Sequence, residues 1–556
     1  MKGGFFMLLI ECSKIKKYFG ERLILDIDDL KVYSEDRIGV VGRNGAGKTT
    51  LINILSKRLE PDEGWVKLYG RAGYISQLEP PDNKTISSEM ASKFGVETVW
   101  NECMSGGEKT RFKFAEALDN NSVLIFADEP TSNVDMEGIE LMEEKLTEYR
   151  GALILISHDR SFLDKLCNRI LEIEDGKVKI YKGNYSEYKK QKDQEKERAE
   201  VEYEEYIREK RRLQKVIQGT KEKVQSIKRP PNRMGNSEAR LHKMGGQKAK
   251  ATLERAIKNV KKRIEHLEVK EKPKEQLGIK LDIQGSAKLY SKLVIEGKNI
   301  HKAFENKVLF DNAEFTVYNG AKVALIGPNG CGKSTLIKMI MNHEEGIKIA
   351  SGAKIGYFSQ EMDLLDDHLS IIENVMKSSI YSESFARLLL ARLLFRRETI
   401  YKKVAVLSGG ERVKVSFAKI LLQDTNLLIL DEPTNYMDIN ALEVMEQTLK
   451  EYDGTLLFVS HDRRFIDAVA NQIMVIENKK ITLFSGNYTE YIRRKNETAD
   501  CHKAEFEKQI IVLENRLSEV IGKLSMPSEK DDMEALDAEY HRILKELRLL
   551  RGKCGK

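Results

Sequence analysis

Two glycine-rich stretches of the chain end in a lysine that is followed by two hydroxyl residues. Such loops let backbone N–H groups approach a phosphate closely, because glycine has no side chain to block them. The lysine can then reach the β- and γ-phosphates of a nucleotide, and the next hydroxyl can bind Mg²⁺. We therefore expect two phosphate loops, made of Gly42, Asn44, Gly45, Ala46, Gly47, Lys48, Thr49 and Thr50, and of Gly327, Asn329, Gly330, Cys331, Gly332, Lys333, Ser334 and Thr335.

A pair of adjacent carboxylates ends an apolar run in each half of the chain. This position predicts that the pair lies where a buried strand ends. The aspartate can hold the metal ion, and the glutamate can accept a proton from an attacking water molecule. Helix capping or surface ion pairing is the alternative, but a glycine-rich loop accompanies the pair in both halves, which argues against it. The pairs are Asp128 with Glu129 and Asp431 with Glu432.

A histidine follows a further apolar run in each half, at His158 and His461. A lone histidine more often packs in a core than takes part in catalysis, but two at equivalent positions indicate sensors of the γ-phosphate. Gln77 and Gln360 give a weaker signal and could be polar residues at strand ends.

These motifs recur in one order, so the chain contains a duplication. The two lysines are 285 residues apart, whereas the carboxylate and histidine motifs are 303 apart, so the second copy is 18 residues longer between its first and later motifs. Short apolar runs rich in β-branched residues predict an α/β fold with a largely parallel sheet buried on both faces. We expect two homologous domains, at residues 7–188 and 291–494.

The charge of this 556-residue chain is concentrated in one place. Its net charge is +6, but residues 189–280 hold 28 Lys and Arg against 15 Asp and Glu, or +13, which leaves −7 for the rest. Within residues 211–250, 12 basic residues face only two acidic ones. Such a field implies a polyanionic partner, and nucleic-acid phosphates are the commonest candidates. The alternative is a solvated helix, which usually interleaves both signs, as the flanks of this segment do.

Residues 189–290 predict a linker that forms a helical hairpin. Two helical patterns, at 191–225 and 237–271, are separated by a break rich in Pro and Gly. The basic section, at about residues 211–250, falls at the turn. The residues expected to contact RNA are Arg211, Arg212, Lys215, Lys221, Lys223, Lys228, Arg229, Arg233, Arg240, Lys243, Lys248 and Lys250.

Residues 495–556 predict a smaller helical extension, arranged as a short antiparallel coiled coil. Four apolar residues share one face of each expected helix. The two sets are Leu513, Leu517, Ile521 and Leu524, and Leu536, Tyr540, Leu544 and Leu547.

Composition excludes several classes of protein. No apolar run approaches the ~20 residues that a membrane helix needs, and the first residues lack the features of a signal peptide. The six cysteines are scattered without the spacing of metal ligands, which is typical of reduced thiols. We expect a soluble, cytoplasmic protein with no membrane partner.

The duplicated set of motifs resembles that of the ATP-binding cassette (ABC) ATPases. A Ser-Gly-Gly-Glu signature lies upstream of Asp-Glu-Pro-Thr in both copies, and the resemblance covers nearly all of each. In that family two cassettes face head to tail, and the signature of one covers the ATP held by the other. The resemblance implies ATP and Mg²⁺ as cofactors and a monomer whose two cassettes pair with each other. It places Lys48 with the second signature and Lys333 with the first.

Further site residues follow from this resemblance alone. The signature residues expected at the nucleotide are Ser105, Gly106, Gly107, Ser408, Gly409 and Gly410. Phe19 and Phe304 hold the position where the family usually stacks an aromatic ring on adenine, although a place in the core would fit them equally. The implied metal ligands are Thr49, Gln77, Asp128, Ser334, Gln360 and Asp431, and both glutamines also belong to the nucleotide site.

Two fused cassettes, a charged helical linker and no membrane segment are similar to the ABC-F subfamily, which binds ribosomes. There the linker enters the tRNA exit region and approaches the peptidyl-tRNA and the peptidyl-transferase centre. Only 28 positions separate Gln77 from Ser105, too few for the extra helical arm of some members. A missing arm with a long linker resembles the antibiotic-resistance members, which protect ribosomes from drugs bound at that centre.

Three alternative functions are carried forward. A housekeeping ABC-F translation factor would share every catalytic motif. A DNA-associated ABC-F ATPase would rely on the C-terminal extension, which lacks a comparable basic excess. The ATPase subunit of a transporter, a different class of protein, gives no reason for the basic linker.

Overall fold

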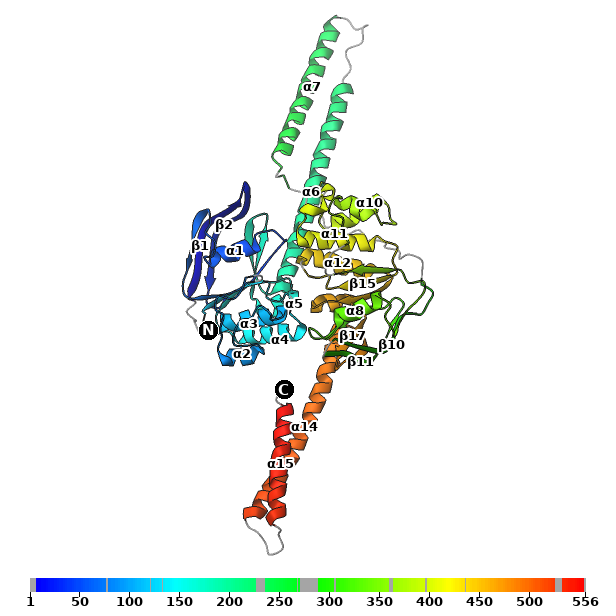
Figure 1. Cartoon of the computed structure of the whole chain (residues 1–556). Coiled ribbons are helices and arrows are strands. Elements are labelled where there is room, and N and C mark those ends of the chain that lie inside the picture. Colours follow the sequence, from blue (N-terminus) through cyan, green and yellow to red (C-terminus); the bar gives the residue numbers. More distant parts are fainter. Residues whose placement is uncertain are drawn as a thin grey trace. The chain divides into compact units, whose positions relative to one another are not determined.

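The computed structural model describes residues 7–76, 79–120, 122–132, 134–226, 236–267, 269–270, 289–304, 307–359, 364–395, 398–435, 437–525 and 533–554 (Figure 1). Only the backbone is described at 236–248, 307, 498–508, 511, 519, 522–525, 533–536 and 549–554. The chain divides into two compact units. Unit 1 is Met1–Pro81, Glu116–Pro130 and Lys145–Lys280, and unit 2 is Asp82–Ala115, Thr131–Glu144 and Leu281–Lys556.

Unit 1 is built on one nine-stranded sheet. Its strands and shorter helices are β1 (Leu8–Phe19), β2 (Arg22–Tyr33), β3 (Arg37–Gly42), α1 (Lys48–Leu55), β4 (Glu63–Leu68), β5 (Ala72–Ile75), β6 (Leu124–Asp128), β7 (Ala152–Ile156), α5 (Arg160–Leu166), β8 (Arg169–Glu174) and β9 (Lys177–Lys182). The strand order is β4-β1-β2-β9-β8-β3-β7-β6-β5. Strands β8, β3, β7, β6 and β5 are parallel, whereas β1 pairs antiparallel with β2 and β4, as β8 does with β9.

The parallel strands of unit 1 are buried on both faces, as predicted. Every residue of β6 and β7 is buried, because these strands are apolar throughout until β6 ends at Asp128. The carboxyl ends of neighbouring parallel strands meet at one edge of a sheet. This edge therefore collects the phosphate loop after β3, Asp128 at the end of β6, and His158 after β7.

Unit 2 contains the sheets of the second copy and most of the helices. Two further helices, α3 (Gly106–Asp119) and α4 (Met136–Glu148), have residues in both units. The elements of unit 2 are α2 (Ser88–Phe94), β10 (Leu293–Phe304), β11 (Lys307–Tyr318), β12 (Lys322–Ile326), α8 (Lys333–Met341), β13 (Ile347–Ile349), β14 (Ile355–Phe358), α9 (Ile371–Met376), α10 (Glu383–Arg392), the 3₁₀ turns η1 (Thr399–Tyr401) and η2 (Val404–Val406), α11 (Gly409–Leu421), β15 (Leu427–Asp431), α12 (Ile439–Glu451), β16 (Thr455–Val459), α13 (Arg463–Val469), β17 (Gln472–Glu477) and β18 (Lys480–Ser485).

These strands of unit 2 form two sheets that repeat the pattern of unit 1. One sheet has the order β11-β10-β13, and the other has the order β14-β15-β16-β12-β17-β18. The second copy is 20 residues longer between β14 and α11, where it has α9, α10 and the 3₁₀ turns and the first copy has the single helix α2, and it is two residues shorter between its lysine and the end of β14.

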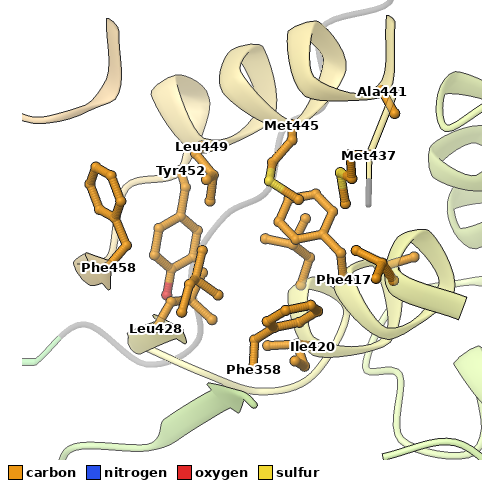
Figure 2. Packing of buried hydrophobic residues seen from close by; sticks show 14 of the residues in the cluster. Phe358, Phe417, Ile420, Leu428, Met437, Ala441, Met445, Leu449, Tyr452 and Phe458 are labelled. Atoms are coloured by element: carbon orange, nitrogen blue, oxygen red, sulfur yellow. The ribbon is translucent and has the colours of Figure 1, made fainter. Parts of the chain in front are cut away.

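A hydrophobic core joins the large sheet of unit 2 to α11 and α12 (Figure 2). Phe417 and Ile420 of α11 pack with Met445 and Leu449 of α12 around Leu428 of β15, and none of the five is more than 1% exposed. Helix α11 begins at the second Ser-Gly-Gly-Glu motif, so this core fixes the signature relative to the strand that carries Asp431.

The linker forms the predicted helical hairpin in unit 1. Helix α6 (Tyr185–Ser226) and helix α7 (Asn236–Glu265) lie side by side (Figure 1). Arg263 lies 3.7 Å from Glu209, and Lys270, just after α7, lies 3.2 Å from Glu202. The partner residue moves back along α6 from Glu209 to Glu202 as the chain advances from Arg263 to Lys270, so the helices are antiparallel. The predicted break between them, at 227–235, is outside the described residues.

The C-terminal extension consists of α14 (Tyr488–Ser525) and α15 (Met533–Cys554), which pack against each other. The expected face was partly wrong, because Ile521 is 44% exposed while Val520 and Ile543 are buried with Leu547. Four-residue steps rotate by about 40° around a helix of 3.6 residues per turn, so a run of such steps leaves the buried face. The side chains of Leu524 and Leu536 are outside the described set.

No helix in the described part of the chain is both long enough and apolar enough to span a membrane.

The core of unit 2 yields a stability prediction. Phe417→Ala should lower the free energy of unfolding by about 3–5 kcal/mol, because it removes a buried ring and leaves a cavity. Guanidinium unfolding followed by circular dichroism measures this change. Val406→Ala is the control, because Val406 is 72% exposed, and it should change stability by at most about 0.5 kcal/mol. Equal effects of the two substitutions would contradict the described packing.

Candidate active site

Each phosphate loop connects a buried strand to the first turn of a helix. In the first, the loop joins β3 to α1, and in the second it joins β12 to α8. Gly47 and Gly332 adopt φ of 96° and 110°, a region that side chains other than glycine's rarely enter. A Cβ atom would lie 2.7 Å from a methyl carbon of Ile24 in the first case and 2.9 Å from the ring of Phe310 in the second. Both loops thus need glycine to keep their N–H groups facing the site.

The two lysines fold back over their own loops. The Nζ atom of Lys48 donates to the carbonyl oxygens of Gly42 and Arg43 at 2.9 and 3.2 Å. Lys333 donates to those of Gly327 and Pro328 at 2.8 and 3.1 Å. Each ammonium is therefore already held at the mouth of its loop, where a phosphate would meet it.

The residues after each lysine fit a magnesium ion. The hydroxyl of Thr49 is hydrogen-bonded to Asp128, and that of Ser334 to Asp431. Burial raises the pKa of Asp128 to about 6, against the effect of Thr49, and burial also raises the pKa of Asp431. Oδ1 of Asp431 is buried without a hydrogen-bond partner among the described residues. Hydroxyl and carboxylate oxygens are hard ligands that suit Mg²⁺, which would neutralise phosphate charge there.

The neighbouring glutamates have a strained backbone. Glu129 and Glu432 adopt φ of 48° and 49°, the left-handed region that costs a residue with a side chain roughly 1–3 kcal/mol. The N–H of each donates to the last residue of the neighbouring strand, Ile156 or Val459, at 3.0 and 3.1 Å. This turn directs the glutamate away from the strand and towards the lysine of the phosphate loop.

Each glutamate lies beside the predicted histidine. Nε2 of His158 is 3.1 Å from Oε1 of Glu129, and Nε2 of His461 is 3.1 Å from Oε1 of Glu432. The described residues give neither Oε1 atom a well-aligned hydrogen bond. A buried acceptor of this kind can take a proton from a water molecule, so the geometry suits a general base.

Burial controls the ionisation of these groups. It raises the pKa of Glu129 to about 7, although the Lys48 ammonium and the His158 N–H oppose the change. It raises the pKa of Glu432 to about 8, with Lys333 opposing and Asp431 adding to the effect. Burial and Lys333 together lower the pKa of His461 to about 4, so its imidazole is neutral at pH 7.

A cavity of about 470 Å³ adjoins the second phosphate loop, within the size range of small-molecule sites. Its lining brings Phe304 together with Lys333, Ser334, Glu432 and His461. Phe304 is 54% exposed and Phe19, at the matching place in unit 1, is 55% exposed. The alternative that these rings belong to the core is therefore wrong. Stacking on adenine stays a prediction.

The signature serines begin helices. Ser408 caps α11 in a capping box with Glu411, and Ser105 makes the same contacts with Glu108, whose carboxylate accepts from the serine N–H and hydroxyl at 2.8 and 2.7 Å. These bonds lower the pKa of Glu108. The glutamate of Ser-Gly-Gly-Glu thus has a structural role, and the helix N-terminus after it can face an anion.

Asp135 is a site residue to which sequence reasoning assigned no role. Within unit 2 its Oδ2 atom accepts a hydrogen bond from the N–H of Asn329 in the second phosphate loop at 3.0 Å. Its Oδ1 atom accepts from Gly138 at 3.0 Å. Burial acts to raise its pKa, but these two N–H groups together with the nearby charge of Arg111 outweigh burial and lower it. Nothing in the spacing of single motifs could have revealed this contact.

A second unpredicted contact lies beside His461. Arg463, the first residue of α13, approaches both carboxylate oxygens of Glu143 of α4 at 3.2 Å. Glu143 is fully buried, so the arginine offsets part of the cost of keeping this carboxylate out of water. Each copy of the repeat has an arginine directly after a Ser-His-Asp sequence, at Arg160 and Arg463. The sequence alone does not identify Glu143 as the partner of Arg463.

Two predicted residues, Gln77 and Gln360, lie outside the described residues. The predicted pairing of Lys48 with Ser408 and of Lys333 with Ser105 stays a prediction, as do the roles of Gly106, Gly107, Gly409 and Gly410.

Known sequences are similar to this chain over most of its length. A sequence profile described as ABC transporter matches residues 25–92 and 310–435, and a second with that description matches 171–245. Erythromycin resistance ATP-binding protein MsrA of Staphylococcus epidermidis is 34% identical, over 83% of this chain and 96% of its own. Ribosome protection protein VmlR of Bacillus subtilis is 31% identical, over 93% and 94%. ABC transporter F family member 5 of Arabidopsis thaliana is 29% identical, over 92% and 80%.

Solved structures share the fold. The archaeal ribosome recycling factor aABCE1, solved with a ribosomal stalk protein, has a TM-score of 0.57 and 20% identity, covering 85% of this chain and 90% of that one. RNase-L Inhibitor has a TM-score of 0.58 at 20% identity, covering 87% and 93%. Likeness at this level concerns the fold alone.

The raised pKa values of the glutamates predict how ATP turnover depends on pH. A carboxylate accepts a proton only when it is ionised, so turnover should rise as pH increases through the pKa. In Glu129→Gln, where only Glu432 can act, the rise should centre near pH 8. In Glu432→Gln, where only Glu129 can act, it should centre near pH 7. Steady-state phosphate release from pH 6 to 9 measures both profiles.

The control for these profiles is Glu89→Gln, a change at an exposed ion pair with Lys93, which should leave the profile unchanged. Two flat, superimposable profiles would contradict a buried glutamate as the base at either site.

Proposed function

Because this chain belongs to the ABC-F family of ATP-binding cassette ATPases, we propose that it binds ribosomes and protects them from antibiotics that target the peptidyl-transferase centre. Family membership makes the chain an ATP-hydrolysing enzyme. The observation that carries the proposal is its similarity, over 93% of its length, to a ribosome protection protein. Similarity to an erythromycin resistance protein supports the same reading.

The linker supplies the chemistry that an RNA partner needs. Arg211, Arg212, Lys215, Lys221 and Lys223 are all exposed on the distal part of α6. Their charges can bind phosphate groups without reading sequence. Three other candidates, Lys228, Arg229 and Arg233, are outside the described residues, and the side chains of Arg240, Lys243 and Lys248 are not described.

The linker would reach the tRNA exit region and the peptidyl-tRNA, where it displaces a drug by reshaping the RNA around it. In this proposal the protein acts in the cytoplasm as a monomer.

ATP would control this placement through the two copies. Each nucleotide would lie between the phosphate loop of one copy and the signature of the other, and the contact of Asp135 with Asn329 supports such an arrangement at the second loop. Glu129 and Glu432 would activate water, with His158 and His461 beside the γ-phosphate. Loss of the γ-phosphate removes contacts that favour the closed state, so hydrolysis permits release.

A housekeeping role in translation is the second candidate. It is supported by similarity to family members with no resistance in their names, such as the Arabidopsis protein at 29% identity. Growth of a deletion strain with and without lincosamides, pleuromutilins and streptogramin A separates the two. Sensitivity confined to drug-treated cultures supports protection, whereas slow growth without drug supports housekeeping.

The double variant Glu129→Gln with Glu432→Gln tests ribosome binding directly. It should bind ATP, lose turnover, and remain on ribosomes, because the contacts to the γ-phosphate are never broken. Sedimentation through sucrose with ATP measures retention, and wild type with ADP is the control that should stay free. A double variant that sediments free of ribosomes, and instead fractionates with membranes, would support the transporter alternative and contradict the proposal.

The linker charges predict a salt dependence. Replacement of Lys215, Lys221 and Lys223 by glutamine should weaken ribosome binding and flatten its dependence on salt, because fewer counterions are released. ATP turnover without ribosomes should be unchanged. The matched control replaces Lys196, Lys258 and Lys261, which lie in the linker outside its basic centre. An unchanged salt slope in the first variant would contradict phosphate contact by α6.

A further inference from the structure

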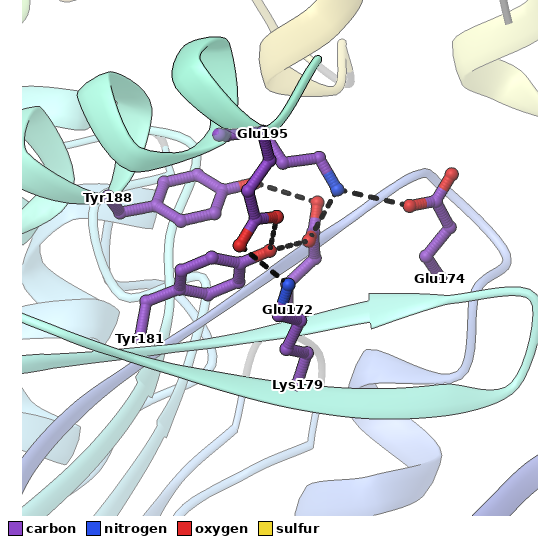
Figure 3. A network of polar contacts seen from close by, with 7 residues as sticks. Glu172, Glu174, Lys179, Tyr181, Tyr188 and Glu195 are labelled. Atoms are coloured by element: carbon purple, nitrogen blue, oxygen red, sulfur yellow. Dashed lines mark hydrogen bonds and ion pairs between the residues drawn. The ribbon is translucent and has the colours of Figure 1, made fainter. Parts of the chain in front are cut away.

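The start of the linker helix α6 carries a partly buried polar network centred on Glu172 of β8 (Figure 3). One carboxylate oxygen of Glu172 accepts from the Tyr188 hydroxyl at 2.8 Å. The other accepts from the Lys192 ammonium at 2.7 Å and lies 3.3 Å from the Tyr181 hydroxyl. Glu172 belongs to the sheet, whereas Tyr188 and Lys192 belong to the first turns of α6, so the carboxylate joins the helix to the sheet.

A second carboxylate closes the network from the helix side. Glu195 of α6 accepts from Lys179 of β9 at 2.7 Å, and the Tyr181 hydroxyl lies 3.0 Å from it. The single hydroxyl proton of Tyr181 is thus shared between Glu195 and Glu172. Lys192 also reaches Glu174 at 3.1 Å. Three elements, β8, β9 and α6, are tied together by these bonds.

The second copy has the same architecture but keeps only one ion pair of the network, between Lys495 and Glu477 at 3.2 Å, which corresponds to Lys192 with Glu174. At an offset of 303, Glu172 corresponds to Val475, Tyr181 to Phe484, Lys179 to Thr482 and Glu195 to Thr498. The positions of Tyr188 and Lys192 are kept, as Tyr491 and Lys495. The helix that starts here in the second copy is α14, which leads to the C-terminal extension rather than to the linker.

The aromatic contact at this place is common to both copies. The rings of Tyr181 and Tyr188 are 5.0 Å apart at their centres, and those of Phe484 and Tyr491 are 5.8 Å apart, both edge to face. The aromatic contact and the single ion pair of the second copy therefore suffice to pack a helix on the hairpin of two strands. The bonds of Glu172, Glu195 and the Tyr181 hydroxyl, which the second copy lacks, are therefore not needed for packing alone.

Hydrogen bonds fix direction in a way that apolar contacts do not. Tyr181 and Tyr188 are 3% and 8% exposed, so a tilt or slide of α6 would leave their hydroxyls without acceptors, which costs free energy in a low-dielectric interior. Apolar side chains lose much less when they slide by a fraction of an ångström. The network thus selects a single orientation of the helix.

The orientation of α6 where it leaves the sheet matters because this helix is long. From Glu195 to Ser226 the helix rises by about 46 Å, at 1.5 Å per residue. A tilt of about 5° at the network would therefore move the far end by about 4 Å, more than the length of a hydrogen bond.

We propose that the Glu172 network fixes the direction of α6 on the first ATPase copy, so that a movement of that copy reaches the linker tip undiminished. This positioning role rests on the proposed function only for its consequence at the ribosome. The fixing of α6 itself concerns the free protein and can be measured there.

The experiment transfers the residues of the second copy into the first. Glu172→Val with Tyr181→Phe and Glu195→Thr carries a combination that already packs a helix at the equivalent place, so it should fold. Glu172→Gln is a milder second variant, which keeps an acceptor for the tyrosines and removes the charge that faces Lys192. Tyr491→Phe, at the matching position in the second copy, is the control.

Amide hydrogen exchange of the full-length protein is the first measurement. Protection over residues 188–200 should fall about tenfold in the triple variant, less in Glu172→Gln, and not in the control, while α14 serves as an internal reference. ATP turnover in the absence of ribosomes should keep its kcat and KM in all three variants. Unchanged exchange in α6 of the triple variant would overturn the proposal.

Ribosome protection is the second measurement, and it separates this proposal from the proposed function. If the triple variant shows faster amide exchange in α6 and no longer protects ribosomes from the drug, the result supports the network as a positioning device for the linker. Looser exchange with full protection overturns the transmission that we propose, although the function stands. A wild-type protein that never binds ribosomes sinks the proposed function, while the exchange result still decides whether the network fixes α6.

Discussion

A carboxylate buried beside a lysine at the end of a parallel strand is the interaction on which this structure depends. Glu129 and Glu432 are kept out of water, which favours their protonated forms, and the ammonium groups of Lys48 and Lys333 pull in the opposite direction. The balance leaves both glutamates able to change protonation near neutrality. The flanking strands, glycine-rich loops and histidines are arranged so that this balance is reached twice in one chain.

The duplication has preserved this chemistry and varied what surrounds it. Phosphate loops, strained glutamates and histidine contacts agree closely between the copies. The sites where α6 and α14 leave the two copies differ, because the second copy has Val475 and Phe484 where the first has Glu172 and Tyr181. The segment before the second signature is also longer, with α9, α10 and two 3₁₀ turns. Catalytic geometry tolerates little change, whereas the helices that leave each copy can take on separate tasks.

The sequence was a good guide wherever chemistry and periodicity coincide. Apolar runs predicted β3, β6, β7, β12, β15 and β16, since a strand buried on both faces leaves no room for polar residues. The structure brings Glu129 and His158 together because each follows one of two neighbouring parallel strands, β6 and β7. The contacts of Asp135 and Arg463 could not be predicted, since their partners lie 194 and 320 residues away. The prediction that Ile521 is buried was wrong because a shift of one residue along a helix decides which side chain faces the core, and here it is Val520.

The left-handed backbone at Glu129 and Glu432 bears on how such a chain can evolve. Glycine would relieve the strain at either position, so drift towards an inactive site would be favoured by folding. Neither packing nor solubility gives a reason to retain a long acidic side chain there. The presence of both glutamates therefore fits the role in hydrolysis that we propose for this residue in each half of the molecule.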